Sequence, residues 1–334
     1  MRKIFLLPLI LLLIFVSGCG GTKTSSNSAN VKSETETAKV ADFKPSLTIK
    51  MLNVGQGDAL LIMTAEQNIL IDTSDVDERT KLVNELEKAN VHTIDKVILT
   101  HPHADHIGGI EKLLKDKNFT IRAVYDNGIA SASKLYLNYM KLLKDSSIKH
   151  ETLKTGDTVD FGGKVKFEVL YPDKKLVDSV NDGKKKTDPN NESIVGRLVY
   201  KDFTMMFTGD AELEVESNIW ADNPESKMNS TILKAGHHGS HTSSSENFVR
   251  VVKPEYVLIS AGEPTDKRGG NTYGHPHVEP LELFLNAGIP SKNILWTWKN
   301  GTVTIETDGK NYSVTPEVKE DWVKQWIKEK KKKK

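Results

Sequence analysis

Short apolar runs separated by turn residues open the folded part of the chain. Residues 47–54, 59–62 and 68–72 form three such runs, and glycine-rich or polar turns join them. They predict an antiparallel meander of three strands. Residues 80–90 repeat apolar side chains at helical spacing, residues 97–99 form a further strand, and a short helix is expected over 109–115.

The second half of the chain repeats this alternation. It predicts strands over 164–170, 193–200, 203–207, 256–260 and 302–306, and helices over 211–220 and 278–287. Residues 174–191 are polar and charged and contain Gly183 and Pro189, so they predict a loop that could act as a flap. Strand clusters that alternate with helices in both halves favour the α/β class, as two sheets packed face to face with helices outside, a four-layer αββα sandwich.

The N-terminus predicts export. Arg2 and Lys3 precede an apolar run over 4–16, which is shorter than the ~20 residues that a membrane-spanning helix needs. The ending Val-Ser-Gly-Cys resembles a bacterial lipobox, so we expect a lipoprotein signal peptide over 1–18 and lipidation of Cys19. Residues 19–45 are polar and poor in bulky apolar side chains, which predicts a flexible tether. The chain is expected to be anchored through Cys19 to the bacterial membrane on its extracytoplasmic side; an uncleaved N-terminal anchor is the alternative.

Residues 46–316 contain no low-complexity break and predict one domain of about 270 residues, near the upper limit for a single core. Residues 317–334 predict an amphipathic helix followed by a lysine-rich tail. The helix could simply pack on the domain, or the lysines could contact a phosphate polymer or a membrane surface. Over the whole chain the charge is balanced, with 46 basic and 45 acidic residues, so no global field argues for nucleic acid.

The segment from Thr100 to Gly109 carries the clearest chemical signal. It places His101, His103, Asp105 and His106 within six positions, directly after an apolar strand. Imidazole and carboxylate groups gathered in this way are typical of a site for transition-metal cations. A structural core has no use for so many titratable groups.

Motifs in a fixed order resemble those of the metallo-β-lactamase superfamily. The motifs are Ile-Leu-Ile-Asp at Asp72, the His-x-His-x-Asp-His loop, Thr-Gly-Asp at Asp210, and His-His-Gly-Ser at His237 and His238. Within the superfamily, Asn-Val-Gly-Gln-Gly-Asp-Ala at 53–59 and Asn-Thr-Tyr-Gly-His-Pro at 271–276 are similar to the hydrolase domain of ComEC-type DNA-uptake proteins and their secreted relatives. Choline-phosphate esterases of the bacterial cell wall share much of this pattern.

The resemblance implies two divalent cations, zinc first and manganese as the alternative. His101 and His103 would hold the first ion, Asp105, His106 and one of His237 and His238 the second, and Asp210 would bridge the two. We favour His238 as the ligand and His237 as an acid or phosphate-facing group, an order that the sequence leaves open. Asp72 would orient a ligand from outside the metal shell. Such an ion pair would activate a water molecule, a task to which Asp105 would also contribute.

One position departs from the superfamily pattern. The histidine expected between His106 and Asp210 is absent, and the corresponding segment reads Asp-Pro-Asn-Asn at 188–191. Asn190 or Asn191 would then supply a weaker oxygen ligand, which predicts looser binding of the first ion and acceptance of manganese. His275, with Asn271 and Tyr273, is expected to face the substrate. His277, His92 and His150 are expected to be structural or surface residues, and the loop ending at Asp58 a tight turn.

The resulting prediction is a surface-anchored, metal-dependent hydrolase of phosphodiesters, with DNA as the first candidate substrate. The alternatives are an esterase acting on a cell-wall phosphoester of the choline-phosphate type, and a non-catalytic surface binding module. The sequence predicts no protein partner.

Overall fold

The computed structural model describes residues 43–267 and 270–332. The expected signal peptide, Cys19 and most of the tether therefore lie outside the described residues. Within the described ranges, the structure contains no helix that is both long and apolar enough to cross a bilayer.

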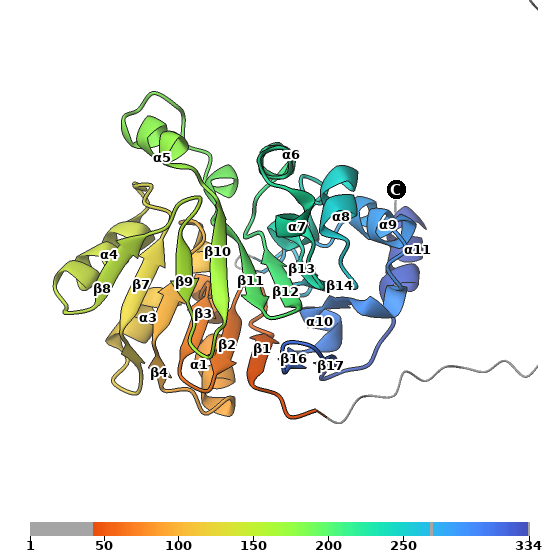
Figure 1. Cartoon of the computed structure of the whole chain (residues 1–334), viewed down its shortest axis with the longest axis horizontal. Helices are drawn as coiled ribbons and strands as arrows, with labels where there is room; N and C mark the ends of the chain where they lie inside the picture. The colour runs from red at the N-terminus through yellow and green to blue at the C-terminus, as the bar shows by residue number, and fades with distance from the viewer. Residues whose placement is uncertain (1–42, 268–269, 333–334) are drawn as a thin grey trace, which may run out of the picture. The chain divides into compact units, whose positions relative to one another are not determined.

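Two large β-sheets form the middle of the domain (Figure 1). In the described residues the first sheet has eight strands in the order β17-β16-β1-β2-β3-β5-β7-β8. Their bounds are β1 Leu47–Met51, β2 Leu60–Thr64, β3 Asn68–Ile71, β5 Lys96–Ile98, β7 Ala123–Asp126, β8 Lys149–Thr152, β16 Val303–Thr307 and β17 Tyr312–Pro316. The meander predicted from the opening apolar runs is confirmed, because β1, β2 and β3 pair antiparallel in sequence order.

The second sheet has seven strands in the described residues, in the order β15-β14-β13-β12-β11-β10-β9. Their bounds are β9 Thr158–Asp160, β10 Lys166–Tyr171, β11 Val195–Tyr200, β12 Phe203–Phe207, β13 Ile232–Lys234, β14 Tyr256–Ile259 and β15 Ile294–Trp296. The short strands β4 Thr93–Ile94 and β6 Thr120–Ile121 pair separately. Strands β12 to β15 run parallel, so their carboxyl ends meet at one edge of the sheet.

Helices cover the outer face of each sheet. Those packed on the first sheet are α1 Arg79–Lys88, α3 Ile110–Lys115 and α4 Lys134–Lys144, and those on the second are α6 Leu213–Asp222, α8 Glu246–Val252, α9 Val278–Asn286 and α11 Val323–Lys332. Shorter elements are α2 Ala104–Ile107, α5 Lys174–Asn181, α7 Glu225–Met228, α10 Thr297–Asn300, and the 3-10 turns η1 Val76–Glu78, η2 Asn190–Glu192, η3 Gly236–Gly239 and η4 Ser291–Asn293.

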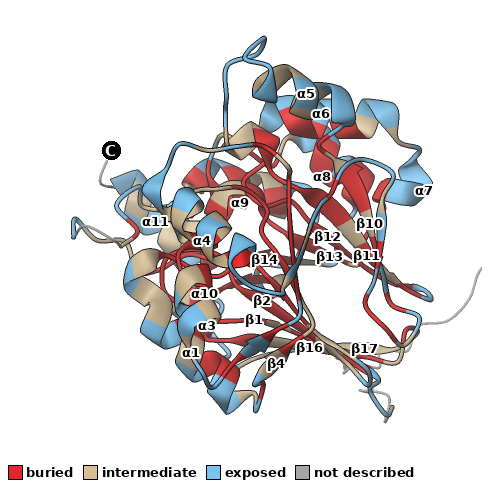
Figure 2. Cartoon of the chain, turned by 90° about the vertical axis from the view of Figure 1, so that its left-hand side faces the viewer, coloured by how far each residue is buried: buried red, intermediate tan, exposed pale blue. Residues whose placement is uncertain are grey.

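Alternation along single strands explains why four layers form. Side chains of a strand point to opposite faces in turn. In β3, Ile69 and Ile71 enter the cluster between the two sheets, whereas Leu70 enters the cluster under α1, α3 and α4. In β12, Met205 faces the other sheet and Met206 faces the helices α6, α8 and α9. The central strands of both sheets therefore bury apolar side chains on both faces, Figure 2 shows these strands largely in red as buried, and the predicted αββα sandwich is confirmed.

The loop predicted over 174–191 is wrong in its first half, which forms α5. The Asp173 carboxylate accepts the Leu176 N–H at 2.7 Å and caps the helix N-terminus. Leu176, Val177 and Val180 recur at helical spacing within an otherwise polar sequence. The composition of this segment suggested a loop because only three apolar residues form the stripe along α5.

Candidate metal centre

Functional side chains of both sheets meet where strands end. Asp72 follows β3 and the Thr100–His106 loop follows β5, and these two strands are parallel neighbours. Asp210 follows β12, and His237 and His238 follow β13. Because the carboxyl ends of parallel strands lie at one edge, residues more than 130 positions apart converge on one place. For example, His238 Nε2 lies 3.1 Å from Asp105 Oδ2.

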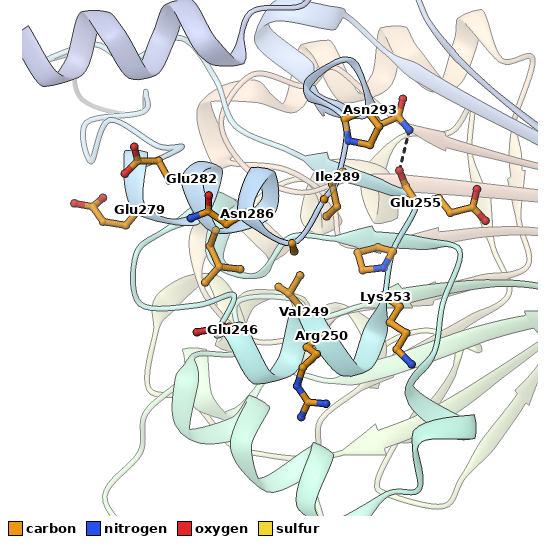
Figure 3. A pocket seen from close by; sticks show the side chains of 15 residues that line it. Glu246, Val249, Arg250, Lys253, Glu255, Glu279, Glu282, Asn286, Ile289 and Asn293 are labelled. Atoms are coloured by element: carbon orange, nitrogen blue, oxygen red, sulfur yellow. Dashed lines mark hydrogen bonds between the residues drawn. The ribbon is translucent and has the colours of Figure 1, made fainter. Parts of the chain in front are cut away.

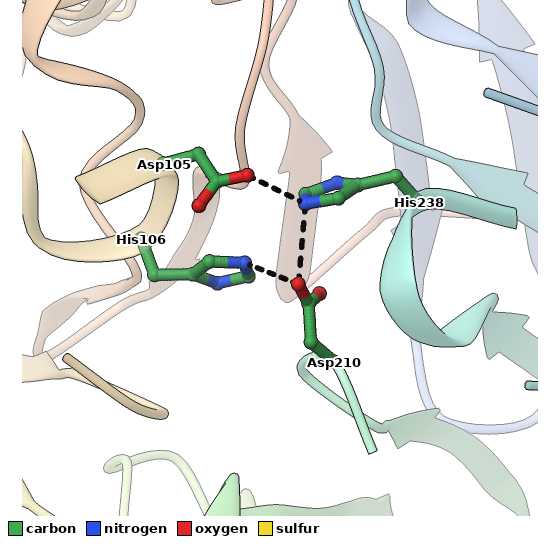
Figure 4. A group of neighbouring side chains, drawn as sticks. All are labelled: Asp105, His106, Asp210 and His238. Atoms are coloured by element: carbon green, nitrogen blue, oxygen red, sulfur yellow. Dashed lines mark hydrogen bonds and ion pairs between the residues drawn. The ribbon is translucent and has the colours of Figure 1, made fainter. Parts of the chain in front are cut away.

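Four side chains form the tightest group, shown in Figure 4: Asp105, His106, Asp210 and His238. Asp210 Oδ2 lies 3.1 Å from His106 Nε2 and 3.4 Å from His238 Nε2. One potential ligand atom from each residue lies within 4.8 Å of the others. These are the residues that the resemblance assigned to the second ion. The sequence had left open whether His237 or His238 completes this group, and the structure places His238 there.

A second group shares Asp210 with the first. His101, His103 and Asp210 also offer ligand atoms within 4.8 Å of one another. His101 Nε2 lies 3.9 Å from Asp210 Oδ2, and the rings of His101 and His103 are 4.7 Å apart. Asp210 is therefore placed to bridge two cations, as expected from the sequence.

Each buried imidazole is fixed through Nδ1 and turns Nε2 inward. His106 Nδ1 donates to Asp72 Oδ2 at 2.8 Å, and His238 Nδ1 donates to the Ser260 carbonyl at 2.7 Å. His101 Nδ1 lies 3.2 Å from the hydroxyl oxygens of both Ser193 and Thr100. Metal-binding histidines are typically anchored in this way.

Polar atoms without a hydrogen bond support a cation at this place. Among the described residues, His101 Nε2 and Asp210 Oδ1 are fully buried and have no hydrogen-bond partner. A buried polar atom left unpaired costs about 1–3 kcal/mol, so such atoms call for a ligand. The donors are imidazole nitrogens and carboxylate oxygens, a set that suits zinc or manganese. The residues present therefore fit a divalent ion pair.

The electrostatics of the cluster point in the same direction. Burial lowers the pKa of His106, but the carboxylates of Asp210 and Asp72 outweigh it and raise that pKa well above its usual value. The pKa of His238 is raised in the same way, by Asp210 and Asp58 against burial. Burial and the neighbouring His106 instead lower the pKa of His101. Cations that bind here must displace protons from His106 and His238, so binding releases protons.

A buried ion pair that the sequence analysis did not predict lies behind the cluster. The Lys234 ammonium contacts the Asp58 carboxylate, and both side chains are about 1% exposed. Lys234 also donates to the Gly209 carbonyl at 3.0 Å, next to Asp210. Asp58 Oδ1 lies 3.3 Å from His238 Nδ1. Asp58, Asp72 and His106 form a third group of acidic and imidazole ligand atoms, but the ammonium of Lys234 already supplies its positive charge.

The turn ending at Asp58 holds the ligand loop from behind. The Asp58 N–H donates to the Asp105 carbonyl at 3.0 Å. A Cβ on Gly57, which has φ +101°, would lie 2.2 Å from that same carbonyl oxygen. Glycine is therefore required at this contact. As expected from the sequence, these residues reverse the chain between β1 and β2, but they do so as bends within a longer connection and not as a hydrogen-bonded tight turn, and they support the metal-ligand loop directly.

His237 lies beside the ligand groups in a polar setting. Its Nδ1 is 2.9 Å from Thr242 Oγ1 and 3.1 Å from Glu212 Oε1, while its Nε2 is 3.9 Å from Asp210 Oδ2. The side chain is 22% exposed, unlike that of His238. Burial lowers the pKa of His237. His237 thus has one nitrogen held by Glu212 and the other directed towards the cluster.

The Asp-Pro-Asn-Asn segment at 188–191, which departs from the superfamily pattern, brings its two asparagines next to His237 and Glu212. Asn190 Nδ2 lies 3.4 Å from Glu212 Oε1 and 3.5 Å from His237 Nε2, and its Oδ1 is buried without a hydrogen-bond partner among the described residues. Asn191 Nδ2 donates to Asp188 Oδ2 at 2.9 Å, and its Oδ1 accepts the Glu212 N–H at 3.1 Å. Only Asn190 keeps a side-chain oxygen that is open to a ligand.

The loop from Asn271 to His277 borders the centre on its other side. The His275 ring lies 6.0 Å from that of His238 and 5.4 Å from that of His237, and its Nδ1 is buried without a hydrogen bond in the described residues. Burial and the neighbouring imidazoles lower the pKa of His275 to about 2, so its ring is neutral. Tyr273 is 77% exposed and stacks on His275.

The structure gives Asn271 a different task from the one expected. Its Nδ2 donates to the carbonyls of Gly262 and His275, at 2.9 and 2.6 Å, and its Oδ1 accepts the His275 N–H at 2.9 Å. All its side-chain polar atoms are bonded to backbone, so Asn271 holds the loop in shape and has no group left to face a substrate.

A large hollow lies elsewhere, between α8 and α9 (Figure 3). It measures about 900 Å³ and is lined by Val249, Leu283 and Ile289 with charged residues around them, but by none of the ligand residues. Its surroundings offer no chemistry comparable to that of the histidine–aspartate cluster.

Comparison with known proteins agrees with this site. The model of the metallo-beta-lactamase superfamily matches residues 52–263. The chain is 30% identical over 276 residues to ComE operon protein 3 of Bacillus subtilis, covering 76% of this chain and 32% of that protein. It is also 30% identical over 229 residues to competence protein ComA of Neisseria gonorrhoeae, covering 68% and 28% respectively.

The chain thus spans about a third of the length of these curated relatives. Among solved structures, it resembles the metallo-beta-lactamase fold protein YhfI of Bacillus subtilis at 13% identity, with a TM-score of 0.49, over 77% of this chain and 99% of that one.

Proposed function

Because the chain belongs to the metallo-beta-lactamase superfamily of metal-dependent hydrolases, we propose that it hydrolyses phosphodiester bonds with a pair of divalent cations and that DNA is its first candidate substrate. Competence proteins among its relatives support DNA. Zinc is the first candidate metal and manganese the second, because the donor set suits both.

One observation carries the proposal. Three imidazoles are anchored through Nδ1 and direct Nε2 towards a single carboxylate, Asp210. His101, His103 and Asp210 would hold one ion, and Asp105, His106, Asp210 and His238 the other. Bound there, the two cations would acidify a water molecule and neutralise charge on the phosphoryl oxygens.

The protein's own groups would handle protons and orientation. His237 Nδ1 lies against Glu212 and Thr242, which fixes its ring and keeps Nε2 towards the centre. Because Glu212 can only accept, the neutral ring keeps its proton on Nδ1, so His237 can donate from Nε2 to the leaving oxygen or a phosphoryl oxygen only after taking up a second proton, a form that burial opposes and the carboxylates of Asp210 and Glu212 favour. His275 stays neutral, so it can contribute a hydrogen bond without a competing charge. Asp72 keeps His106 in the orientation that binds a cation.

A panel of substrates tests the proposal. Single-stranded DNA, bis(p-nitrophenyl) phosphate, p-nitrophenylphosphocholine and a chromogenic β-lactam are incubated with the protein in zinc or manganese. We expect turnover of the first two, and loss of that turnover in Asp210→Asn. Turnover of only the phosphocholine ester would favour the cell-wall esterase, turnover of only the β-lactam would overturn the phosphoester assignment, and no turnover would favour the binding module.

The cellular location is a separate proposal. We propose that Cys19 is lipidated and anchors the protein outside the cytoplasmic membrane, because the lipobox-like ending precedes a polar tether. Cells grown with a labelled fatty acid should carry the label on the unaltered protein. They should lose it in Cys19→Ser, which should also release the protein from the membrane fraction. An unlabelled protein that remains in the membrane fraction after this substitution would support the uncleaved N-terminal anchor instead.

A further inference from the structure

The C-terminal helix α11 packs directly against the loop that borders the metal centre. Trp326 Nε1 donates to the Pro276 carbonyl at 3.1 Å, near the end of the Asn271–His277 loop. Lys330 lies over the Trp326 ring, 4.5 Å from its centroid, and a Cβ added to Gly274 would lie 3.5 Å from Lys330 Nζ. The lysine-rich end of the chain therefore begins at the rim of the site.

The charge of this helix is strongly one-sided. Between Val323 and Lys332 it contains one glutamate, Glu329, and the five lysines Lys324, Lys328, Lys330, Lys331 and Lys332. Lys328, Lys331 and Lys332 are exposed, and only Lys331 among these three forms an ion pair that is seen in the described residues, with Glu282 at 2.6 Å. A lysine cluster beside a site that cuts phosphate esters would complement a chain of phosphates.

Two histidines continue the polar rim towards the metal centre. His241 Nδ1 lies 2.9 Å from His277 Nδ1, and the His277 ring lies 4.8 Å from the His275 ring. His277 Nε2 lies 3.2 Å from the Tyr273 carbonyl, to which it donates. A series of neighbouring rings thus leads from His238 through His275 to His277, and Lys330 lies beside Gly274 of the same loop.

An exposed aromatic ring lies on the same rim. Tyr273 is 77% exposed, and its ring stacks on His275 with an interplanar angle of 16°. The Asn271 side chain fixes the backbone of this loop through its bonds to Gly262 and His275. A rigid aromatic face beside a basic helix is the combination with which proteins bind single-stranded nucleic acid, because every base can stack on it.

We propose that Tyr273 and the lysine-rich end of α11 bind the part of a single-stranded nucleic acid that extends beyond the cleaved bond. This inference rests on the proposed function for the identity of the cleaved bond. Its own content is that the strand leaves the metal centre past Tyr273, with a base on the tyrosine ring and its phosphates along Lys330, Lys331 and Lys332.

Binding without turnover tests this proposal. A fluorescein-labelled thymidine strand of about 12 nucleotides, a length within the usual site size of single-strand binders, is titrated with the full chain in EDTA. The variants are Lys330→Gln/Lys331→Gln/Lys332→Gln, Tyr273→Ala and Tyr273→Phe. The matched control replaces three exposed lysines of α4, as Lys134→Gln/Lys141→Gln/Lys144→Gln. Circular dichroism confirms that each variant is folded.

We expect Tyr273→Ala to weaken binding about tenfold and Tyr273→Phe to keep it, because stacking needs only the ring. The α11 variant should bind more weakly than the α4 control. It should also reduce the slope of log affinity against log salt by up to about 2, since each lost phosphate contact contributes about 0.7 for a single strand.

Equal affinities of the α11 variant and the α4 control would overturn the inference, as would Tyr273→Ala binding like the unaltered protein. Loss of binding to phosphatidylglycerol vesicles in the α11 variant, with oligonucleotide binding intact, would also overturn it and assign the helix to the membrane. None of these results depends on catalysis. Failure of the unaltered protein to cut bis(p-nitrophenyl) phosphate or DNA would instead contradict the proposed function.

Discussion

Asp72 accepts the Nδ1–H of His106 at 2.8 Å and thereby turns His106 Nε2 towards Asp210. The same carboxylate accepts the backbone N–H and the hydroxyl of Thr100, both at 2.8 Å. One buried side chain therefore fixes both the start of the ligand loop and the orientation of a ligand within it. The metal centre depends on this contact even though Asp72 itself need not touch a cation.

Replacing Asp72 should weaken metal binding without removing a ligand. Asp72→Asn keeps the shape of the side chain but loses the charge that orients His106, so metal affinity should fall about 10–100-fold. Competition with a chromogenic chelator measures it. The control is Asp95→Asn, because the Asp95 carboxylate pairs with Arg122 near the surface. This variant should keep the metal affinity of the unaltered protein. Unchanged affinity in Asp72→Asn would show that His106 is held by other contacts.

The buried pair of Lys234 and Asp58 should matter far more to stability than an exposed pair. Lys234→Met removes the ammonium and leaves the buried Asp58 carboxylate with only the nearby imidazoles of His238 and His106, which should cost up to about 3–5 kcal/mol in the free energy of unfolding. Adding Asp58→Leu should recover part of the loss, because no buried carboxylate then lacks its ammonium partner. Urea denaturation measures both.

The control for this prediction is the pair of Lys253 and Glu225, whose side chains are 57% and 56% exposed. Lys253→Met should cost less than about 1 kcal/mol. Equal losses in the buried and the exposed variant would contradict the role assigned to burial.

The two metal positions should differ in affinity. One position is surrounded by four ligand residues, Asp105, His106, Asp210 and His238. The other has only three, His101, His103 and Asp210. A rising concentration of chelator should therefore remove one ion before the second. His103→Ala should abolish the weaker step and keep the stronger one. A single cooperative release of both ions would contradict this asymmetry.

His150 and Asp126 provide a pH-dependent contact that belongs to none of the ligand groups. His150 Nε2 lies 2.8 Å from Asp126 Oδ2, and this hydrogen bond raises the pKa of His150 against the effect of burial. A raised folded-state pKa gives a contribution that is present below the ordinary value of about 6.5 and is lost as pH rises through the higher folded value.

The stability difference between the unaltered protein and His150→Gln should thus be larger at pH 5.5 than at pH 8.5. Because the His150 side chain is 27% exposed, we expect a difference below about 1 kcal/mol. Urea midpoints at the two pH values, measured in EDTA so that metal binding does not contribute, provide the test. A larger difference at the higher pH would reverse the sign that we assign.

The sequence predicted the fold class, and its resemblance to the superfamily predicted the members of the two ligand groups apart from the choice between His237 and His238. His101, His103, Asp105 and His106 are local in sequence, and Asp210 and His238 follow strands whose parallel arrangement brings their ends together. The structure was needed to decide which of His237 and His238 joins the ligand group. Both residues have left-handed backbone conformations, with φ 45° and 54°, and only the resulting directions place His238 in the cluster.

Long-range polar contacts were beyond reach of the sequence. Asp58 ends a turn that reads as purely structural, and its role depends on Lys234, which lies in a buried strand far along the chain. Lysine in an apolar strand gives no signal of its own without its partner. Likewise, Asn271 belongs to a motif next to His275, yet its amide is used entirely by backbone atoms. The contribution of α11 to the rim became visible only through the contact of Trp326 with Pro276.

Metal content tests the central claim most directly. The purified protein is dialysed to equilibrium against zinc or manganese over a range of free concentrations, and the metal bound per chain is measured by mass spectrometry at each concentration. The shared carboxylate of Asp210 predicts two ions per chain, and a loss of the pair in Asp210→Asn. One tightly held zinc ion, with no second ion at any concentration of manganese, would contradict the account.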